Sequence, residues 1–232
     1  MKKVIKIILI GDGDNSEVIY DFIKKNKDYS VKYIIGKKNS NRNFSKIKHL
    51  NYNFNFKNLL NDYFFLCTIA DNYNRKKIFN FFNIKYKKKI KWVSLIGHNV
   101  TLETKVKIGK GSIIFPYTNI GYNTKIGNFC LINHSCHIEH HNKFKNFTSV
   151  GPKVVTGGNV TIGKYSYIGI NSTINHNLKI SENVIVGAKS LITKNCKNNS
   201  TYFGHPAKFI KKRKTGELFD MLQGLLQCQA FI

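Results

Sequence analysis

A six-residue repeat runs through the second half of the chain and constrains its fold more than any other feature. From Ile96 to Ile192, every sixth position carries Ile, Leu or Val in fifteen of seventeen cases, and the exceptions are Phe144 and Thr156. The window 96–192 holds 27 such residues, so one phase of six should hold about 4.5 by chance. A repeat with no change of register is typical of a solenoid built from one short unit.

Two neighbouring phases indicate what each unit builds. The residue after the repeat position is Gly at nine places, and the residue two before it is usually small or β-branched. Side chains alternate along a strand, so both apolar phases, including Cys130 and Cys136, should face the interior, while glycine suits the corners. Three units close a triangular turn, and turns stacked at about 4.8 Å predict an all-β parallel β-helix domain over residues 91–210.

Residues 1–90 lack the repeat and alternate strands with helices, which predicts a small α/β, Rossmann-like domain. The expected strands are Val4–Ile10, Val31–Ile35 and Tyr63–Ala70, and the expected helices are Glu17–Lys25 and Asn74–Phe82. Residues 211–232 show helical apolar spacing and are expected to form a C-terminal helical tail.

The first strand leads into a turn, Gly11-Asp12-Gly13, at the start of a helix. A dinucleotide-binding fingerprint would need a third glycine where the chain has Ser16, so this pattern gives little support to an NAD site. The turn suits a helix N-terminus beside a phosphate, and Gly11, Asp12, Gly13 and Ser16 are therefore candidate nucleotide-sugar contacts. A strand-to-helix turn without a ligand is the alternative.

The chain is strongly basic, with 38 Lys and Arg against 12 Asp and Glu and a formal net charge of +26. Such a charge is typical of nucleic-acid or anionic-membrane binders. However, the lysines are spread along the whole chain, and Lys, Asn, Ile, Phe and Tyr are all encoded by AT-rich codons, which favours codon bias. A positive potential would still attract substrates that carry phosphates.

Cysteine usage and hydropathy favour a cytoplasmic protein. The five cysteines are odd in number and form no CxxC pair, which fits a reduced protein better than a disulfide scaffold. The apolar run Ile7–Ile10 is too short for a signal peptide, and no stretch approaches the ~20 apolar residues of a membrane span.

Four segments together resemble NeuD/PglD-type bacterial sugar O- or N-acetyltransferases. They are the turn GDGDNSE after the first strand, Thr68–Phe79 (TIADNYNRKKIF), Asn133–His141 (NHSCHIEHH) with Ser149–Gly163, and Phe203–Lys208 (FGHPAK). The resemblance covers about residues 3–210. It implies a left-handed β-helix, a homotrimer, acetyl-CoA as co-substrate, and a nucleotide-linked amino-sugar bound with the help of the N-terminal domain.

Four histidines, His134, His137, His140 and His141, lie within eight residues and admit three interpretations. A metal site is disfavoured because His134 and His140 share one phase of the repeat and should diverge on adjacent faces, and we expect no metal. Ordinary corner histidines are the second interpretation. The third is a general base, because histidine titrates near neutral pH.

The resemblance favours the third interpretation and assigns the general base to His140, which would take a proton from the sugar amine or hydroxyl. Gly158, 18 residues later, should lie one turn above His140, leaving room for the acetyl group and offering an N–H to the oxyanion. In the family an acidic residue directly follows the base and orients it, and this chain has His141 at that position. Glu139, the residue before His140, should not replace the acid because its side chain should point the other way. Asn133 matches a position that contacts the sugar.

The same resemblance places the acetyl-CoA site at Gly158, Ser149, Gly204, Pro206 and Lys208. Ser149 occupies a position where the family commonly has His. The function predicted from the sequence is acetyl-CoA-dependent N-acetylation of a nucleotide-linked amino-sugar for surface-glycan biosynthesis. The alternatives are O-acetylation of sialic acid or another sugar and, from a different class, an inactive trimeric scaffold or a basic nucleic-acid binder.

Overall fold

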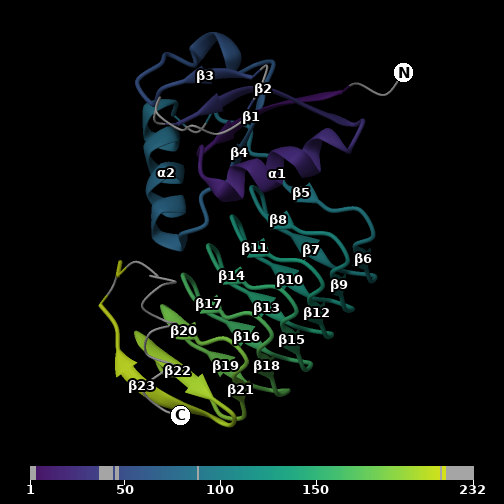
Figure 1. Ribbon diagram of the computed structural model, residues 1–232, viewed down its shortest axis with the longest axis vertical. Helices are drawn as coiled ribbons and strands as arrows, with labels where there is room; N and C mark the ends of the chain where they lie inside the picture. Colours follow the sequence, from purple (N-terminus) through teal and green to yellow (C-terminus); the bar gives the residue numbers. More distant parts are fainter. Residues whose placement is uncertain (1–3, 37–43, 45–46, 88, 215, 218–232) are drawn as a thin grey trace.

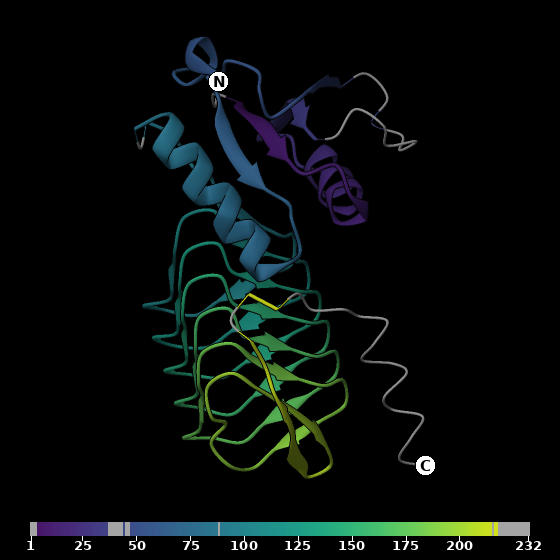
Figure 2. The ribbon, with the colours of Figure 1, turned by 90° about the vertical axis from the view of Figure 1, so that its left-hand side faces the viewer.

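The computed structural model describes residues 4–36, 44, 47–87, 89–214 and 216–217. A small α/β domain caps one end of a long three-sided prism of short strands (Figure 1). Turned by 90°, the molecule shows the strands of the cap between its two helices, with the turns of the prism stacked below (Figure 2). The predicted fold class, an α/β domain followed by a parallel β-helix, is confirmed.

The cap is a four-stranded parallel sheet in the order β3-β2-β1-β4. Its elements are β1 (Ile5–Ile10), α1 (Asp14–Lys24), β2 (Tyr29–Ile35), β3 (Lys48–Leu50), the 3-10 helix η1 (Lys57–Leu59), β4 (Phe64–Cys67) and α2 (Asn72–Lys85). Alternate residues of β1 serve different cores, because Ile7 and Leu9 pack with α1 while Ile8 and Ile10 pack with α2. The two helices therefore cover opposite faces of the sheet.

The sequence located these elements with small errors. Helix α1 begins at Asp14 rather than Glu17, because Gly13 already serves as its N-cap in an extended conformation. Helix α2 begins at Asn72 rather than Asn74, since the side chain of Asp71 accepts a hydrogen bond from the Asn74 backbone N–H and caps the helix. Strand β3 and helix η1 were not predicted, because they lie in a segment with little apolar periodicity.

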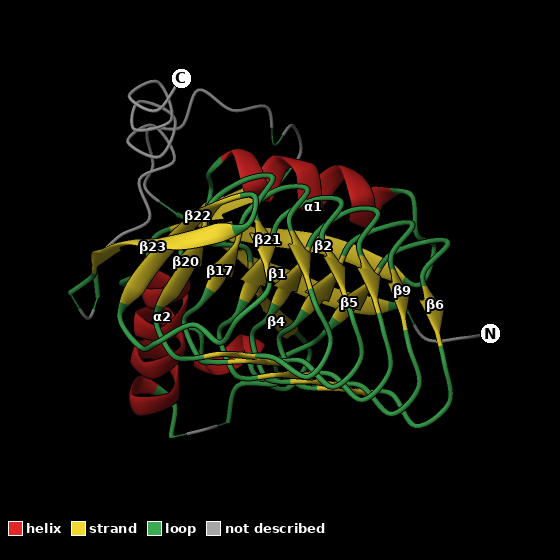
Figure 3. Cartoon of the chain, turned by 90° about the horizontal axis from the view of Figure 1, so that it is seen from below, coloured by secondary structure: helices red, strands yellow, loops and turns green. Residues whose placement is uncertain are grey.

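The prism has three faces, each a sheet whose strands come from successive turns (Figure 3). Face one contains β5 (Leu95–Ile96), β8 (Ile113–Ile114), β11 (Leu131–Ile132), β14 (Ser149–Val150), β17 (Tyr167–Ile168), β20 (Val184–Val186), β22 (Ser200–Gly204) and β23 (Ala207–Lys212). Face two contains β6 (Thr101–Leu102), β9 (Asn119–Ile120), β12 (His137–Ile138), β15 (Val155–Thr156), β18 (Thr173–Ile174) and β21 (Leu191–Ile192). Face three contains β7 (Lys107–Ile108), β10 (Lys125–Ile126), β13 (Lys143–Phe144), β16 (Thr161–Ile162) and β19 (Lys179–Ile180).

The strands pair in parallel with partners 18 residues away, as His137 does with Val155 and Leu131 with Ser149. The repeat positions fill the interior, including the fully buried Ile120, Ile162 and Ile174. The second interior phase is rich in Ser, Thr and Cys for a reason that the sequence did not reveal. Their side chains donate to the corner carbonyl 15 residues later, as Thr124 does to Glu139 (3.0 Å) and Ser172 to Gly187 (2.8 Å).

The cap and the prism share their hydrophobic cores. Phe129 and Phe147, from corners of the prism, belong to the same buried cluster as Phe65 and Phe82 of the cap, with Trp92 between them. Ile113 and Leu131, which point outward from face one, belong to the cluster that contains α1. Face one is therefore the docking surface of the cap, and Ile113 and Leu131 are apolar at outward positions for that reason.

The C-terminal end differs from a simple continuation of the repeat. Strands β22 and β23 form an antiparallel hairpin at the end of face one, so the predicted boundary at residue 210 falls inside β23. Residues 218–232 lie outside the described residues, and the helix expected there stays a prediction. Among the described residues, no helix has both the length and the apolar character needed to cross a membrane.

Candidate active site

His140 and His141 lie at the corner between faces two and three, between β12 and β13. Both side chains are exposed. His141 adopts a left-handed backbone conformation (φ 60°), as do Asn123 and Asn159 at the same corner in the turns before and after. Residues of this type tolerate positive φ better than branched side chains, so the local geometry follows from the repeat.

Gly158 lies directly against the ring of His140. A Cβ atom at residue 158 would be 2.4 Å from Cε1 and 2.7 Å from Nε2 of His140. A side chain at residue 158 would collide with the imidazole in this position, so the glycine leaves room for the His140 ring. The predicted relation between these two residues is thus observed in the structure, as a contact between neighbouring turns.

The two imidazoles form a pair, with 2.9 Å between their Nδ1 atoms. A neutral imidazole carries one N–H and one lone pair, so in this contact one ring donates and the other accepts. When His140 donates from Nδ1, its Nε2 beside Gly158 keeps a lone pair that can accept a proton. Glu139 takes no part, because its carboxylate contacts Nε2 of His137 at 3.0 Å.

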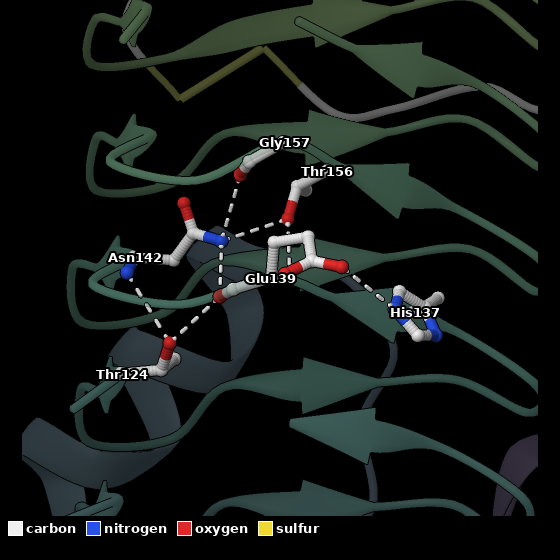
Figure 4. A network of polar contacts seen from close by, with 6 residues as sticks. All are labelled: Thr124, His137, Glu139, Asn142, Thr156 and Gly157. Carbon is white, nitrogen blue, oxygen red and sulfur yellow. Dashed lines mark hydrogen bonds and ion pairs between the residues drawn. The ribbon is translucent and has the colours of Figure 1, made fainter. Parts of the chain in front are cut away.

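A buried polar network lies inside the prism behind this corner (Figure 4). The two N–H groups of Asn142 Nδ2 are shared among three acceptors: the carbonyls of Glu139 (2.7 Å) and Gly157 (3.0 Å) and Oγ1 of Thr156 (2.8 Å). The Asn142 Oδ1 accepts a hydrogen bond from the Val160 N–H at 2.6 Å. The side chains of Asn142 and Thr156 are fully buried. The sequence carried a signal for this network, because Thr156 and Asn142 are exceptions in the two interior phases.

Asn133 lies at the other end of β12, at the corner between faces one and two. Its Oδ1 accepts from the backbone N–H and Nδ1 of His134, both at 2.8 Å. The same corner continues through Gly151, Gly169 and Gly187 to the β22–β23 hairpin, which carries Gly204, Pro206 and Lys208. One chain therefore places these residues on the opposite side of face two from His140.

Ser149 occupies a different environment from the one predicted. It is 4% exposed, and its hydroxyl contacts Oδ1 of Asn72 (2.6 Å) and Nη2 of Arg75 (3.0 Å) of helix α2. It lies on face one under the cap, so its side chain is not available to CoA. The reason is tertiary, because α2 covers this stretch of face one.

The N-terminal turn is tightly packed. Gly11 has a φ of +117°, and a Cβ there would be 2.8 Å from Oγ1 of Thr68. Ser16 is buried, and its hydroxyl bonds to Thr68 at 2.6 Å, which corrects its prediction as a ligand contact. Gly13, at the N-cap of α1, leaves the helix terminus open to an anion. The Asp12 carboxyl fills the space beside Gly36 at the end of β2.

The described residues contain no group of His, Cys, Asp and Glu side chains that could hold a metal ion. His134 packs on Phe115 at its own corner, where burial lowers its pKa. Cys130 and Cys136 lie in the core as predicted, and burial raises the pKa of each thiol to about 11. Such thiols are poor nucleophiles at neutral pH.

Comparison with known proteins supports the resemblance seen in the sequence. Residues 6–82 match the family model of the PglD N-terminal domain. No curated protein matches the chain at a significant level. A variant of GDP-perosamine N-acetyltransferase from Caulobacter crescentus, in complex with CoA and GDP-perosamine, superposes with a TM-score of 0.80 at 18% identity, over 89% of this chain and 97% of that chain.

Two further structures have the same fold. The acetyltransferase domain of PglB from Neisseria gonorrhoeae FA1090, in complex with acetyl coenzyme A, has a TM-score of 0.78 at 18% identity, over 89% of this chain and 100% of that chain. WeeI from Acinetobacter baumannii AYE has a TM-score of 0.74 at 21% identity, over 88% and 100%. Residues 6–82 thus match the PglD N-terminal domain family, and the chain as a whole shares its fold, a small α/β domain followed by a parallel β-helix, with these three bacterial structures.

Proposed function

We propose that the protein is a cytoplasmic acetyl-CoA-dependent N-acetyltransferase acting on the amino group of a nucleotide-linked amino-sugar in surface-glycan biosynthesis. The observation that carries this proposal is the His140 ring, paired through Nδ1 with His141 and lying against a glycine. The fold supports it, since similar structures hold CoA with GDP-perosamine or acetyl-CoA alone.

The geometry suggests a direct transfer. Nε2 of His140 takes a proton from the sugar amine as that amine attacks the thioester carbonyl. The Gly158 N–H, which is used by no backbone hydrogen bond among the described residues, stabilises the oxyanion of the tetrahedral intermediate. The C–S bond then breaks, and His140 returns its proton to the departing CoA sulfur. The products are the N-acetylated sugar and CoA.

His141 would stabilise the imidazolium by accepting the Nδ1–H of His140, which an acidic residue does in the similar family. A neutral imidazole is a weaker acceptor than a carboxylate because it brings no opposite charge. An amine needs less activation than a sugar hydroxyl, so this pair favours N-acetylation over O-acetylation.

The remaining ligand contacts are proposed from position. Gly11, Asp12 and Gly13 contact the nucleotide at the N-terminus of α1, while Gly204, Pro206 and Lys208 border CoA. Asn133 and the hairpin lie across face two from His140 in one chain. We therefore propose a homotrimer in which the Asn133 corner of one copy faces the His140 corner of the next.

A thiol-release assay tests the function. Acetyl-CoA is offered with UDP-, GDP- and dTDP-linked 3- and 4-amino-sugars and with sialic acid, and free CoA is measured. We expect release with one amino-sugar, and His140→Ala should lower kcat by about 10²–10⁴-fold because the base is lost. Lys164→Ala, exposed at a corner that holds no candidate group, is the control and should keep full activity. Gly163→Ala in the same turn would not serve, because its Cβ would collide with Ser181.

Each other outcome has a distinct meaning. Release with sialic acid alone would establish O-acetylation. Full turnover in His140→Ala would exclude His140 as the base. No release from a folded trimer, together with salt-dependent RNA binding, would support the nucleic-acid binder instead.

A further inference from the structure

The buried pair Asn142 and Thr156 stands out because Thr156 is the one polar residue at the repeat positions, and Asn142 carries an amide in a phase otherwise rich in Ser, Thr and Cys. Most interior Ser, Thr and Cys side chains bond to one or two corner carbonyls. The Asn142 side chain makes four hydrogen bonds, to Glu139, Thr156, Gly157 and Val160. Two of these partners, Glu139 and Gly157, directly precede His140 and Gly158.

The bonds to these two carbonyls determine where the next N–H groups point. In a trans peptide the C=O and the following N–H point in opposite directions. The Gly157 carbonyl is held toward the interior by Asn142 at 3.0 Å, so the Gly158 N–H points outward, toward the space beside His140. The Glu139 carbonyl is held inward by both Asn142 (2.7 Å) and Thr124 (3.0 Å).

Thr156 joins the two turns. The Thr156 hydroxyl accepts hydrogen bonds from Nδ2 of Asn142 (2.8 Å) and from the Glu139 N–H (3.3 Å), and both of these residues lie in the preceding turn. The Glu139 carbonyl is thus held by two interior side chains, and the Glu139 N–H is shared between the hydroxyl and the backbone carbonyl of Thr156 (3.3 Å each), immediately before the residue that carries the imidazole. The side-chain amide of Asn142 ties the corner at Glu139 to the corner at Gly157 in the next turn. These contacts therefore set the separation between the His140 backbone and the Gly158 N–H.

We propose that Asn142 and Thr156 are positioning residues for the reaction described above, and this inference rests on that proposed function. They align the Gly158 N–H and the His140 imidazole so that one acyl group can meet both. Neither side chain touches the substrate, since both are fully buried. Their chemistry is the orientation of two peptide groups across neighbouring turns.

The test compares two buried threonines whose hydroxyls each have two polar partners. Thr156→Val keeps the shape and removes the hydroxyl, and valine is a residue type common at interior positions. Thr148→Val is the matched control, because the buried Thr148 hydroxyl binds Lys145 O (2.7 Å) and Gly163 O (3.1 Å) at a corner without candidate catalytic groups. Thr156→Ser restores the hydroxyl, and Asn142→Ser is a second disruption that retains one short polar group.

We expect Thr156→Val and Asn142→Ser to lower kcat by about 10- to 100-fold with little change in KM for acetyl-CoA, since a small misplacement of reacting groups is costly. Thr156→Ser and Thr148→Val should keep the wild-type kcat. In a His140→Ala background, Thr156→Val should have no further effect. The His140 Hε1–Cε1 NMR signal should shift in Thr156→Val and stay unchanged in Thr148→Val.

The NMR signal separates this inference from the proposed function. A wild-type protein without activity, but with a His140 signal that moves in Thr156→Val, would refute the function and retain the positioning. Wild-type kcat in both folded variants, an equal loss in Thr148→Val, or a His140 signal unmoved by Thr156→Val would overturn the inference.

Discussion

At the scale of single residues, the His140–His141 pair distinguishes this chain from a site with a carboxylate behind the base. The contact between the two Nδ1 atoms is exposed and short at 2.9 Å. It fixes the ring of His140 and leaves Nε2 facing Gly158. In the proposed mechanism, His141 therefore contributes one hydrogen bond to His140, without the charge that an acid would add.

Replacing His141 with Gly should lower kcat about tenfold, which corresponds to roughly 1.4 kcal/mol and to one hydrogen bond. Glycine adopts the left-handed conformation at residue 141 without strain, so the melting temperature should stay near that of the wild type. Asn123→Gly, at the same corner one turn earlier with φ 54°, is the control and should keep full activity. An unchanged kcat in His141→Gly would remove His141 from the mechanism.

At the scale of elements, one buried arginine joins helix α2 to the prism. Arg75 is fully buried, and its Nε donates to the Phe129 carbonyl at 2.8 Å. Its Nη1 donates to the carbonyls of Ile69 and Ala70, and its Nη2 contacts Asn72 and Ser149. Burial lowers the pKa of Arg75, and the hydrogen-bond acceptors around the guanidinium oppose this effect by stabilising its charge.

Arg75→Met should lower the free energy of unfolding by about 3 kcal/mol, because it leaves three carbonyls without a donor at about 1 kcal/mol each. Lys77→Met removes the same charge from an exposed position of α2 and should change stability by less than about 0.5 kcal/mol. Urea denaturation followed by circular dichroism measures both. Equal midpoints for the two variants would show that Arg75 does not join the parts.

At the scale of the whole molecule, the cap and the prism are one packing unit. Trp92 lies between Phe65 of the cap and Phe129 of the prism, with ring centroids 6.3 Å and 4.9 Å away. Removing the cap would expose the apolar outward residues of face one, Ile113 and Leu131. The two parts should therefore stabilise each other.

Unfolding in urea should follow a single transition. Trp92 fluorescence, which reports the junction, and far-UV circular dichroism, which reports the sheets, should give the same midpoint. Loss of the Trp92 signal at a lower urea concentration, with the β-sheet signal retained, would mean that the cap separates while the prism remains folded.

The fold also determines where the positive charge lies on the surface of the molecule. Lysines that are spread along the sequence meet on face three, where Lys107, Lys125 and Lys143 are exposed on successive turns and Lys179 follows beyond Thr161. Face three borders the His140 corner. A positive surface there would attract the phosphates of CoA and of a nucleotide-sugar.

The sequence by itself determined the prism, its 18-residue turn and the meeting of His140 with Gly158, because a repeat converts distance along the chain into position in space. The sequence also predicted most helices and strands of the small α/β domain, because apolar periodicity and helix-capping residues are local features. Only the tertiary structure decided what the repeat cannot encode. The cap buries Ser149, which the family resemblance placed in the CoA site, and Ser16, which the turn pattern placed beside a nucleotide. Face two separates Asn133 from His140 in one chain. Asn142 and Thr156, two exceptions 14 residues apart, become partners because neighbouring turns bring them together inside the prism.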